Sequence, residues 1–280
     1  MKKESTLDLI SNTPLIYLDK IHNGKGKIFG KLENLQPGGS VKDRAALQII
    51  KDAYSSKQLK KGQYVVEMTS GNMGAGLAVV CKQMGNPLIL TMSKGNSPER
   101  LKILRALGAE VILTEQVDGK PGMVTGNDIE FAANTAKDIA REKGAFYVDQ
   151  LHNLSGIKAH FETTGPEILN DLNNIDVFIA SLGSGATFIG TSKYLKSKNK
   201  NIKCVVVEPA SAAFLKTGTV TNPKHIIQGT GYGFLPTGWD AQIVDEIITV
   251  TNEEVEEMTK RLALEQGLYV GYSSGANAMA

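Results

Sequence analysis

The sequence predicts an α/β fold built from two open, mostly parallel twisted sheets flanked by helices. Three observations predict it. Short β-branched runs recur along the chain, amphipathic helical stretches lie between most of them, and the strand runs are continuously apolar. Continuous apolar runs are typical of strands buried on both faces of a parallel sheet. Eight such runs exceed what one small sheet usually holds, so we expect two α/β domains.

The elements alternate in chain order. The expected strands are residues 28–32, 64–68, 87–92, 110–114, 146–148, 176–181, 204–208 and 246–250. The expected helices are residues 41–59, 74–85, 98–108, 128–144 and 255–267. Strand, helix and strand repeated in this way predict parallel pairing, with loops at the carboxyl ends of the strands available for ligands.

Composition excludes several classes of protein. The chain has 280 residues, 41% of them hydrophobic and 21% charged, with a net charge of +2. This balance gives no reason to expect nucleic acid or a membrane surface as a partner. Cys81 and Cys204 lie in apolar runs without CxxC spacing, and we expect a reducing, cytoplasmic location. The four histidines have no metal-ligand spacing, so no metal is expected.

Three glycine-containing loops each follow a strand or an extended segment and lead into a helix. They read TSGNMG at residues 69–74, GSGAT at 183–187 and YSSGAN at 272–277. Backbone N–H groups at a helix N-terminus, beside short polar side chains, are what an anion needs. Taken singly, each loop is more often an ordinary helix cap. GSGAT is also no dinucleotide fingerprint, because Phe188 stands where the third glycine belongs.

The segment GGSVKDRAA, residues 38–46, raises a separate question. It leads into a helix whose first turn carries Lys42. Cations are favoured at the other end of a helix, where they complement the dipole. Taken alone, Lys42 is more often a solvated helix lysine.

Taken together and in this order, GGSVKDR, TSGNMG, GSGAT and SSGA resemble the fold-type II pyridoxal-phosphate enzymes. The nearest group is the cysteine synthase and cystathionine β-synthase family, whose fold is that of the tryptophan synthase β subunit. SNTPLIYL, TTGPEI and GTGYGFLP extend the resemblance over the whole chain. The resemblance implies a larger cofactor-binding domain, residues 1–37 and 150–280, and a smaller mobile substrate-binding domain, residues 38–149.

The resemblance also implies the site residues. Lys42 matches the lysine that forms a Schiff base with pyridoxal 5′-phosphate, and a helix N-terminus helps to keep that amine neutral. Ser273 matches the residue that faces the pyridine nitrogen, where a neutral hydroxyl suits β-elimination better than transamination. The expected cofactor ligands are Lys42, Asn72, Gly183, Ser184, Gly185, Ala186, Thr187 and Ser273. The expected substrate-binding residues are Thr69, Ser70, Gly71, Asn72, Met73, Gln150, Gly231 and Tyr232.

The implied reaction is β-replacement on a serine-derived amino acid through an aminoacrylate intermediate. Cysteine synthesis from O-acetylserine and sulfide is the first choice. Cystathionine synthesis is the main alternative, because Tyr232 and GTGYGFLP look more like that branch. A third alternative starts from cysteine and releases hydrogen sulfide. Met73 replaces a common threonine of the family, which leaves the identity of the substrate open.

The resemblance extends to partners. It implies a homodimer that acts on a small amino acid and a thiol or sulfide. A serine acetyltransferase is a possible partner, and a non-catalytic sensor of that enzyme is the non-enzymatic alternative. The intact Lys42 argues against such a sensor. Relatives have a further helix and strand after the third loop, so we expect more chain after residue 280.

Overall fold

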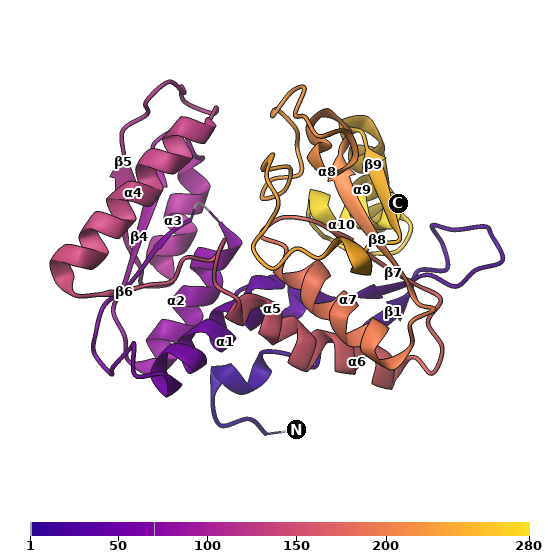
Figure 1. The fold of residues 1–280 in the computed structure, drawn as a ribbon, viewed down its shortest axis with the longest axis horizontal. Helices are drawn as coiled ribbons and strands as arrows, with labels where there is room; N and C mark the ends of the chain where they lie inside the picture. Colours follow the sequence, from indigo (N-terminus) through magenta and orange to yellow (C-terminus); the bar gives the residue numbers. More distant parts are fainter. Residues whose placement is uncertain (1, 70) are drawn as a thin grey trace. The chain divides into compact units, whose positions relative to one another are not determined.

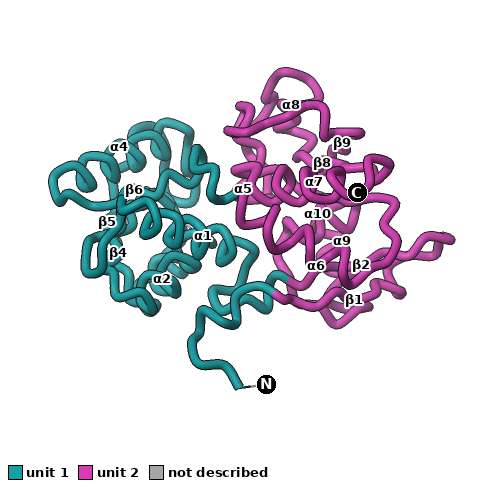
Figure 2. Tube along the Cα trace, turned by 60° about the horizontal axis from the view of Figure 1, so that its bottom comes forward, with its two compact units in different colours: residues 1–11, 33–156 teal, residues 12–32, 157–280 magenta. Residues whose placement is uncertain are grey.

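The computed structural model describes residues 2–69 and 71–280, and the chain divides into two compact units (Figure 2). Unit 1 comprises Met1–Ser11 and Glu33–Gly156, and unit 2 comprises Asn12–Leu32 and Ile157–Ala280. Residues 1–11, 33–37 and 150–156 therefore belong to the same compact unit as residues 38–149. The predicted domain division, with a mobile smaller domain, stays a prediction.

Unit 1 is built on a four-stranded parallel sheet with the strand order β5-β4-β3-β6. Its strands are β3 (Val65–Met68), β4 (Leu88–Ser93), β5 (Glu110–Thr114) and β6 (Phe146–Tyr147). Its main helices are α1 (Lys42–Ser55), α2 (Asn72–Met84), α3 (Pro98–Ala106) and α4 (Gly126–Lys143) (Figure 1). Because β3 pairs with both β4 and β6, the loops that follow β3 and β6 leave from neighbouring strands at one edge of the sheet.

Side chains of the unit 1 strands alternate between two apolar layers. Val65 and Leu90 pack into the cluster that holds α1 and α2, whereas Val66 and Ile89 pack against Ala136 and other residues of α4. All six residues of β4 are buried. The expectation of strands covered on both faces is therefore confirmed for the centre of this sheet.

Unit 2 contains a three-stranded parallel sheet in the order β7-β8-β9. Its strands are β7 (Val177–Ser181), β8 (Lys203–Pro209) and β9 (Glu246–Val250). Its helices are α6 (Gly165–Asp171), α7 (Ala186–Lys198), α8 (Phe214–Thr217), α9 (Asn252–Leu264) and α10 (Tyr272–Met279); α5 (Ser155–Ala159) lies at the boundary of the units. Cys204 and Val206 face the cluster that includes α7, and Val207 faces the cluster that includes α9 and α10. Helices thus cover both faces of this sheet as well.

One predicted strand differs from the expectation. Residues 28–32 contain β2 (Phe29–Lys31), which pairs antiparallel with β1 (Leu15–Tyr17) in a separate two-stranded sheet. No residue of β2 is fully buried. Because β1 and β2 form a sheet of their own, β2 is not enclosed between other strands as β4 is.

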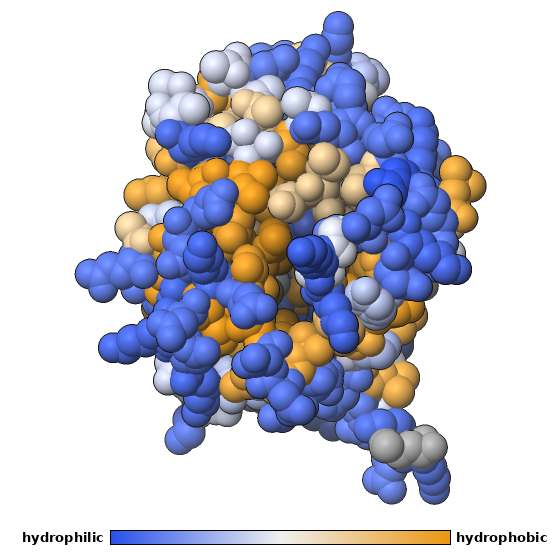
Figure 3. All heavy atoms as spheres, turned by 90° about the vertical axis from the view of Figure 1, so that its right-hand side faces the viewer, coloured by the Kyte–Doolittle hydropathy of each residue, from blue (hydrophilic) through white to orange (hydrophobic). Residues whose placement is uncertain are grey.

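Both cysteines are free and buried, Cys81 in α2 and Cys204 in β8. Burial raises the pKa of the Cys81 thiol to about 12 and also raises that of Cys204. Apolar side chains nevertheless reach the surface on the face drawn in Figure 3, where hydrophilic ones surround them. Among the described residues, no helix combines the length and the apolar character needed to cross a bilayer.

Candidate active site

Lys42 is the first residue of α1, and the turn before it is built from glycine and serine. The Lys42 backbone N–H donates to Ser40 Oγ at 3.3 Å, and that of Asp43 donates to Ser40 O at 3.2 Å. Burial lowers the Lys42 pKa from 10.5 to about 8. The positive end of the helix dipole acts in the same direction. A minor fraction of this amine is therefore neutral near physiological pH, far more than for an exposed lysine, and the neutral form is the one that a nucleophilic lysine needs.

The two residues after Lys42 fix the start of the helix. The Asp43 carboxylate accepts a short hydrogen bond from the Gly38 backbone N–H. It also packs closely against Gly76 of α2, where an added Cβ would lie 3.1 Å from Asp43 Oδ1. Arg44, which is fully buried, pairs with Glu33 through Nε and Nη2. Asp43 and Arg44 therefore support the start of the helix.

The TSGNMG loop connects β3 to α2 in unit 1. Thr69 is buried, and its Oγ1 accepts from the Gly71 backbone N–H at 3.3 Å. Asn72 is exposed at the first position of α2, whereas Met73 is 3% exposed and packs in the unit 1 core. Ser70, a predicted substrate ligand, lies outside the described residues. The exposed amide of Asn72 and the N-terminus of α2 suit a carboxylate, while Met73 contributes an apolar contact.

Gln150 follows β6 and lies beside the carboxyl end of β3. Its Nε2 donates to Met68 O and to Glu67 Oε1, each at 3.3 Å, and its backbone N–H donates to Glu67 Oε2 at 3.4 Å. Glu67 is 1% exposed, and this desolvation raises its pKa to about 8. Glu67 was not among the predicted site residues. It lies inside the apolar run YVVEM, where one sequence gives no sign of its partner.

The GSGAT loop joins β7 to α7 in unit 2, and close backbone approaches shape it. A Cβ on Gly183 would lie 2.2 Å from Gly229 O. Gly185 caps α7 with a φ of +84°, and a Cβ there would lie 2.8 Å from Ile189 and Pro236. The first N–H groups of α7, starting at Ala186 and Thr187, have no intrahelical acceptors. Glycine backbone, helix dipole and the hydroxyls of Ser184 and Thr187 form a donor set that fits a phosphate.

His160 supports Thr187 from behind the loop. It is buried in a π-helical turn, His160–Thr164, and its Nδ1 lies 2.8 Å from Thr164 Oγ1. Its Nε2 lies 3.2 Å from Thr187 Oγ1. Gly190 of α7 lets this turn approach, since a Cβ there would lie 2.8 Å from His160 Cβ and 3.0 Å from Phe161 N. Sequence spacing missed this arrangement, because it joins residues 27 positions apart through an irregular helix.

Residues 229–236 form a second glycine-rich loop against the GSGAT loop. Gly229, Gly231 and Gly233 all have positive φ, and a Cβ on Gly231 would lie 2.7 Å from His225 Nε2. Tyr232 and Phe234 are 41% and 43% exposed, and their rings stack with centroids 5.7 Å apart. This pair offers an apolar surface beside the predicted phosphate loop.

Ser273 lies in the first turn of α10 and is exposed. A second residue of that helix fixes its position. Asn277 Oδ1 accepts from the Ser181 backbone N–H at 2.7 Å and from the Ser181 hydroxyl. Ser181 ends β7, and only Leu182 separates it from the GSGAT loop. Asn277 therefore holds α10 against the strand that carries this loop, a role that the sequence reading did not anticipate.

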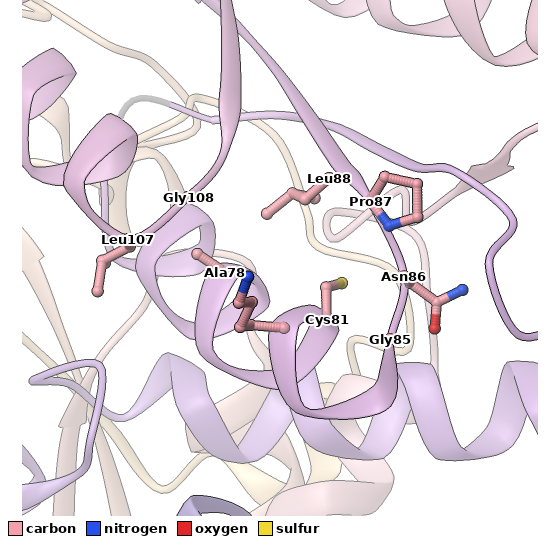
Figure 4. A pocket seen from close by; sticks show the side chains of 9 residues that line it. Ala78, Cys81, Gly85, Asn86, Pro87, Leu88, Leu107 and Gly108 are labelled. Atoms are coloured by element: carbon pink, nitrogen blue, oxygen red, sulfur yellow. The ribbon is translucent and has the colours of Figure 1, made fainter.

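A cavity in unit 1 lies away from the TSGNMG loop and Gln150 of the same unit. It has a volume of about 270 Å³, is lined by residues of α2 and the segments 85–88 and 107–108, and borders the amino end of β4 (Figure 4). The predicted loops leave the carboxyl ends of the strands, so this cavity belongs to the opposite edge of the sheet. Within residues 2–69 and 71–280, no three His, Cys, Asp or Glu side chains gather as a metal site.

Comparison with known proteins identifies the family. Residues 6–280 match the pyridoxal-phosphate dependent enzymes. Cysteine synthase B of Campylobacter jejuni is 40% identical over 278 residues, which cover 99% of this chain and 88% of that protein. A hydrogen sulfide-producing enzyme from Fusobacterium nucleatum superposes with a TM-score of 0.91 at 37% identity, covering 100% of this chain and 90% of that one. For an O-acetylserine dependent cystathionine β-synthase from Helicobacter pylori the TM-score is 0.89 at 33% identity, with 99% and 89% covered.

The chain therefore belongs to the pyridoxal-phosphate dependent enzymes, and its cofactor is pyridoxal 5′-phosphate. The predicted family and α/β fold are confirmed. The roles of the individual site residues stay predictions. Taken separately, two groups of residues suit the cofactor chemically: the lysine of lowered pKa suits a Schiff base, and the donor set of the GSGAT loop suits a phosphate.

Proposed function

We propose that this enzyme makes cysteine from O-acetylserine and sulfide by β-replacement. One observation carries the proposal for the chemistry: Lys42 begins a helix, and burial lowers its pKa to about 8. The cysteine synthase of Campylobacter jejuni, 40% identical, supports the choice of reaction.

Bound pyridoxal phosphate supplies an electron sink that stabilises negative charge at the substrate Cα. The neutral amine of Lys42 can accept the proton from that carbon. Thr69, Asn72 and Gln150 would bind the substrate carboxylate through their polar side chains. The N–H groups and hydroxyls of residues 183–187 would hold the phosphate. Ser273 would offer the pyridine nitrogen a neutral hydroxyl, which favours protonation of that nitrogen less than a carboxylate would.

The role of Lys42 is tested with a matched pair of lysine variants. Lys42→Ala should lose turnover and the absorbance band of the cofactor-linked enzyme while keeping the native circular dichroism spectrum. Lys51→Ala, at an exposed position of the same helix, should keep both. Near-normal turnover of purified Lys42→Ala would remove the assignment.

The donor and the acceptor are tested on the intact holoenzyme. O-acetylserine, serine and cysteine are added separately, and the cofactor absorbance is recorded for each. Sulfide or homocysteine is then added, and the product is identified by mass spectrometry. We expect O-acetylserine to change the spectrum, and sulfide to restore it with release of cysteine. A spectral change with cysteine alone, together with free sulfide, would identify a hydrogen sulfide-releasing enzyme instead.

Homocysteine is the second candidate acceptor, favoured by the exposed aromatic pair Tyr232 and Phe234. Such a pair can bind the longer aliphatic chain of a thiol better than it can bind sulfide. Tyr232→Ala should then lower kcat/KM for homocysteine by several-fold and leave that for sulfide nearly unchanged. Equal losses for both acceptors would give Tyr232 no part in choosing between them.

We further propose a cytoplasmic homodimer that can bind a serine acetyltransferase, as the family resemblance implies. Light scattering on the purified protein measures the oligomer, and co-elution with a serine acetyltransferase tests the partner. A monomeric mass at micromolar concentration would contradict the homodimer.

A further inference from the structure

Glu67 is a buried carboxyl that the proposed chemistry does not use. It lies on the face of β3 that carries Val65, which packs with α1 and α2, and it directly precedes the strand end that leads into TSGNMG. Its side chain is 1% exposed. A carboxyl in such a place needs partners, and the structure supplies them from the backbone of Asp149 and, above all, from Gln150.

Gln150 gives Glu67 two donors. Its Nε2 donates to Glu67 Oε1 at 3.3 Å, and its backbone N–H donates to Glu67 Oε2 at 3.4 Å. The second Nε2 hydrogen is directed at Met68 O, also at 3.3 Å. Both hydrogens of the amide are therefore used inside unit 1, in long hydrogen bonds that a stronger acceptor can replace.

A substrate carboxylate needs the same hydrogens. In the proposed function Gln150 is one of the groups that bind it, and the only donor on a glutamine side chain is its NH₂ group. We propose that Glu67 is a positioning residue that competes with the substrate α-carboxylate for the side-chain amide of Gln150. This inference rests on the proposed function.

Charge decides how strongly Glu67 competes. An ionised carboxylate accepts a hydrogen bond about twice as strong as a neutral acceptor does, and it also repels a second carboxylate. Burial, assisted by the charge of Asp149, raises the Glu67 pKa to about 8. At pH 7 Glu67 is mostly neutral and releases the amide, whereas at pH 9 it is mostly ionised and retains it.

The groups that face Glu67 set the background for this titration. Asp149 and Tyr147 interact with it electrostatically, and the Tyr147 pKa is itself raised by burial and by both carboxylates. Asp149 in turn lies 2.8 Å from His152 Nδ1. Lys42 also changes charge near pH 8, so a pH profile of the natural enzyme alone cannot isolate Glu67. A difference between two variants can, because Lys42 is common to both.

The experiment measures the binding of L-alanine to the holoenzyme by calorimetry between pH 6.5 and 9.5. L-alanine has a carboxylate but no leaving group. From pH 7 to pH 9 the affinity of the natural enzyme for L-alanine should fall by up to about tenfold more than that of Glu67→Gln. Tenfold is about the largest change that one titrating group can cause over this range. At pH 7 the two proteins should differ by less than threefold. Parallel profiles would overturn the inference.

Gln150→Ala separates this inference from the proposed function. It should weaken L-alanine binding at pH 7 and abolish the pH-dependent difference made by Glu67→Gln. If Gln150→Ala binds L-alanine normally, Gln150 is no carboxylate ligand, and the inference fails while the lysine chemistry stands. If Gln150→Ala weakens binding but Glu67→Gln changes nothing, only the inference fails.

A second measurement compares the natural holoenzyme with Glu67→Gln by nitrogen-15 NMR. It follows the side-chain amide signal of Gln150, which is identified by its absence in Gln150→Ala. In the natural holoenzyme the signal should move with a midpoint near pH 8, and this movement should be lost in Glu67→Gln. Addition of L-alanine at pH 7 should also shift the signal. A signal that stays fixed between pH 6.5 and 9.5 would overturn the competition.

Discussion

The guanidinium of Arg44 binds the carboxylate of Glu33 through two hydrogen bonds of 2.7 Å, donated by Nε and Nη2. Arg44 belongs to the first turn of α1, and Glu33 lies in a short 3₁₀ helix nine residues before Lys42. The ion pair therefore clamps the chain on both sides of the GGS turn. Its arginine side chain is completely buried, and its carboxylate is 15% exposed.

Arg44→Met should lower the free energy of unfolding by about 3–5 kcal/mol, because it leaves a largely buried carboxylate without its cation. Urea denaturation measures the loss. The matched control is Arg141→Met, which breaks the exposed pair with Asp138 and should cost at most about 1 kcal/mol. A loss below 1 kcal/mol for Arg44→Met would mean that the clamp adds nothing to stability.

The lowered pKa of Lys42 makes the stability of the cofactor-free protein depend on pH. Below about pH 8 the amine is charged in the folded and the unfolded chain alike, so the folded state bears the whole cost of burying it. Between pH 8 and 10.5 the unfolded chain binds more protons, so stability rises with pH. The natural protein should therefore gain stability relative to Lys42→Met across that window. Denaturation at pH 7, 9 and 10 checks the sign, and a constant difference would contradict the lowered pKa.

Gly185→Ala should damage both folding and cofactor binding. The φ of +84° alone costs an alanine roughly 1–2 kcal/mol, and the new Cβ also meets Ile189 and Pro236 at 2.8 Å. Gly218→Ala is the control, since Gly218 has a φ of +76° with nothing within 4 Å of a Cβ. We expect Gly185→Ala to lose more stability than the control and to weaken pyridoxal-phosphate binding by about tenfold or more, or about 1.4 kcal/mol. Equal losses in the two variants would show that the loop tolerates a side chain.

Asn277→Ala should loosen the strand end before the phosphate loop. It removes the acceptor of two Ser181 donors, which costs about 1–3 kcal/mol when the donors stay unpaired. Thermal unfolding and cofactor titration should both report the change. Asn199→Ala, which removes an exposed turn hydrogen bond from Asn201, is the comparison. If both variants melt together with the natural protein, Asn277 does not hold α10 against β7.

The sequence predicted the strands well where the sheet buries them. The run at residues 87–92 became β4, because continuous apolar residues fit a strand covered on both faces. The helix α7 was expected only as the helix into which GSGAT leads. Its extent was not predicted, because serine, threonine and lysine interrupt its apolar pattern. The π-helical turn at His160 was also missed, since an irregular helix has no sequence period of its own.

The sequence likewise predicts some residues of the candidate site and not others. Lys42 and the three loops could be predicted because their residue types recur in a known family. The structure adds the reason for glycine at position 185, which is its positive φ and the lack of space for a Cβ. Glu67, His160 and Asn277 could not be found. Each acts through one partner distant in the sequence, Glu67 on Gln150, His160 on Thr187 and Asn277 on Ser181. A single chain without its fold does not reveal such pairs.

The two cysteines have a chemical consequence for the proposed reaction with sulfide. Sulfide and thiols exchange with disulfides and oxidised thiols, and they do so through thiolates that solvent can reach. Cys81 and Cys204 are buried, and burial keeps the Cys81 thiol protonated up to about pH 12. The folded protein therefore offers its own reagents no sulfur with which to form a mixed disulfide or persulfide, and its activity should withstand sulfide and oxidant concentrations that inactivate enzymes with exposed thiols.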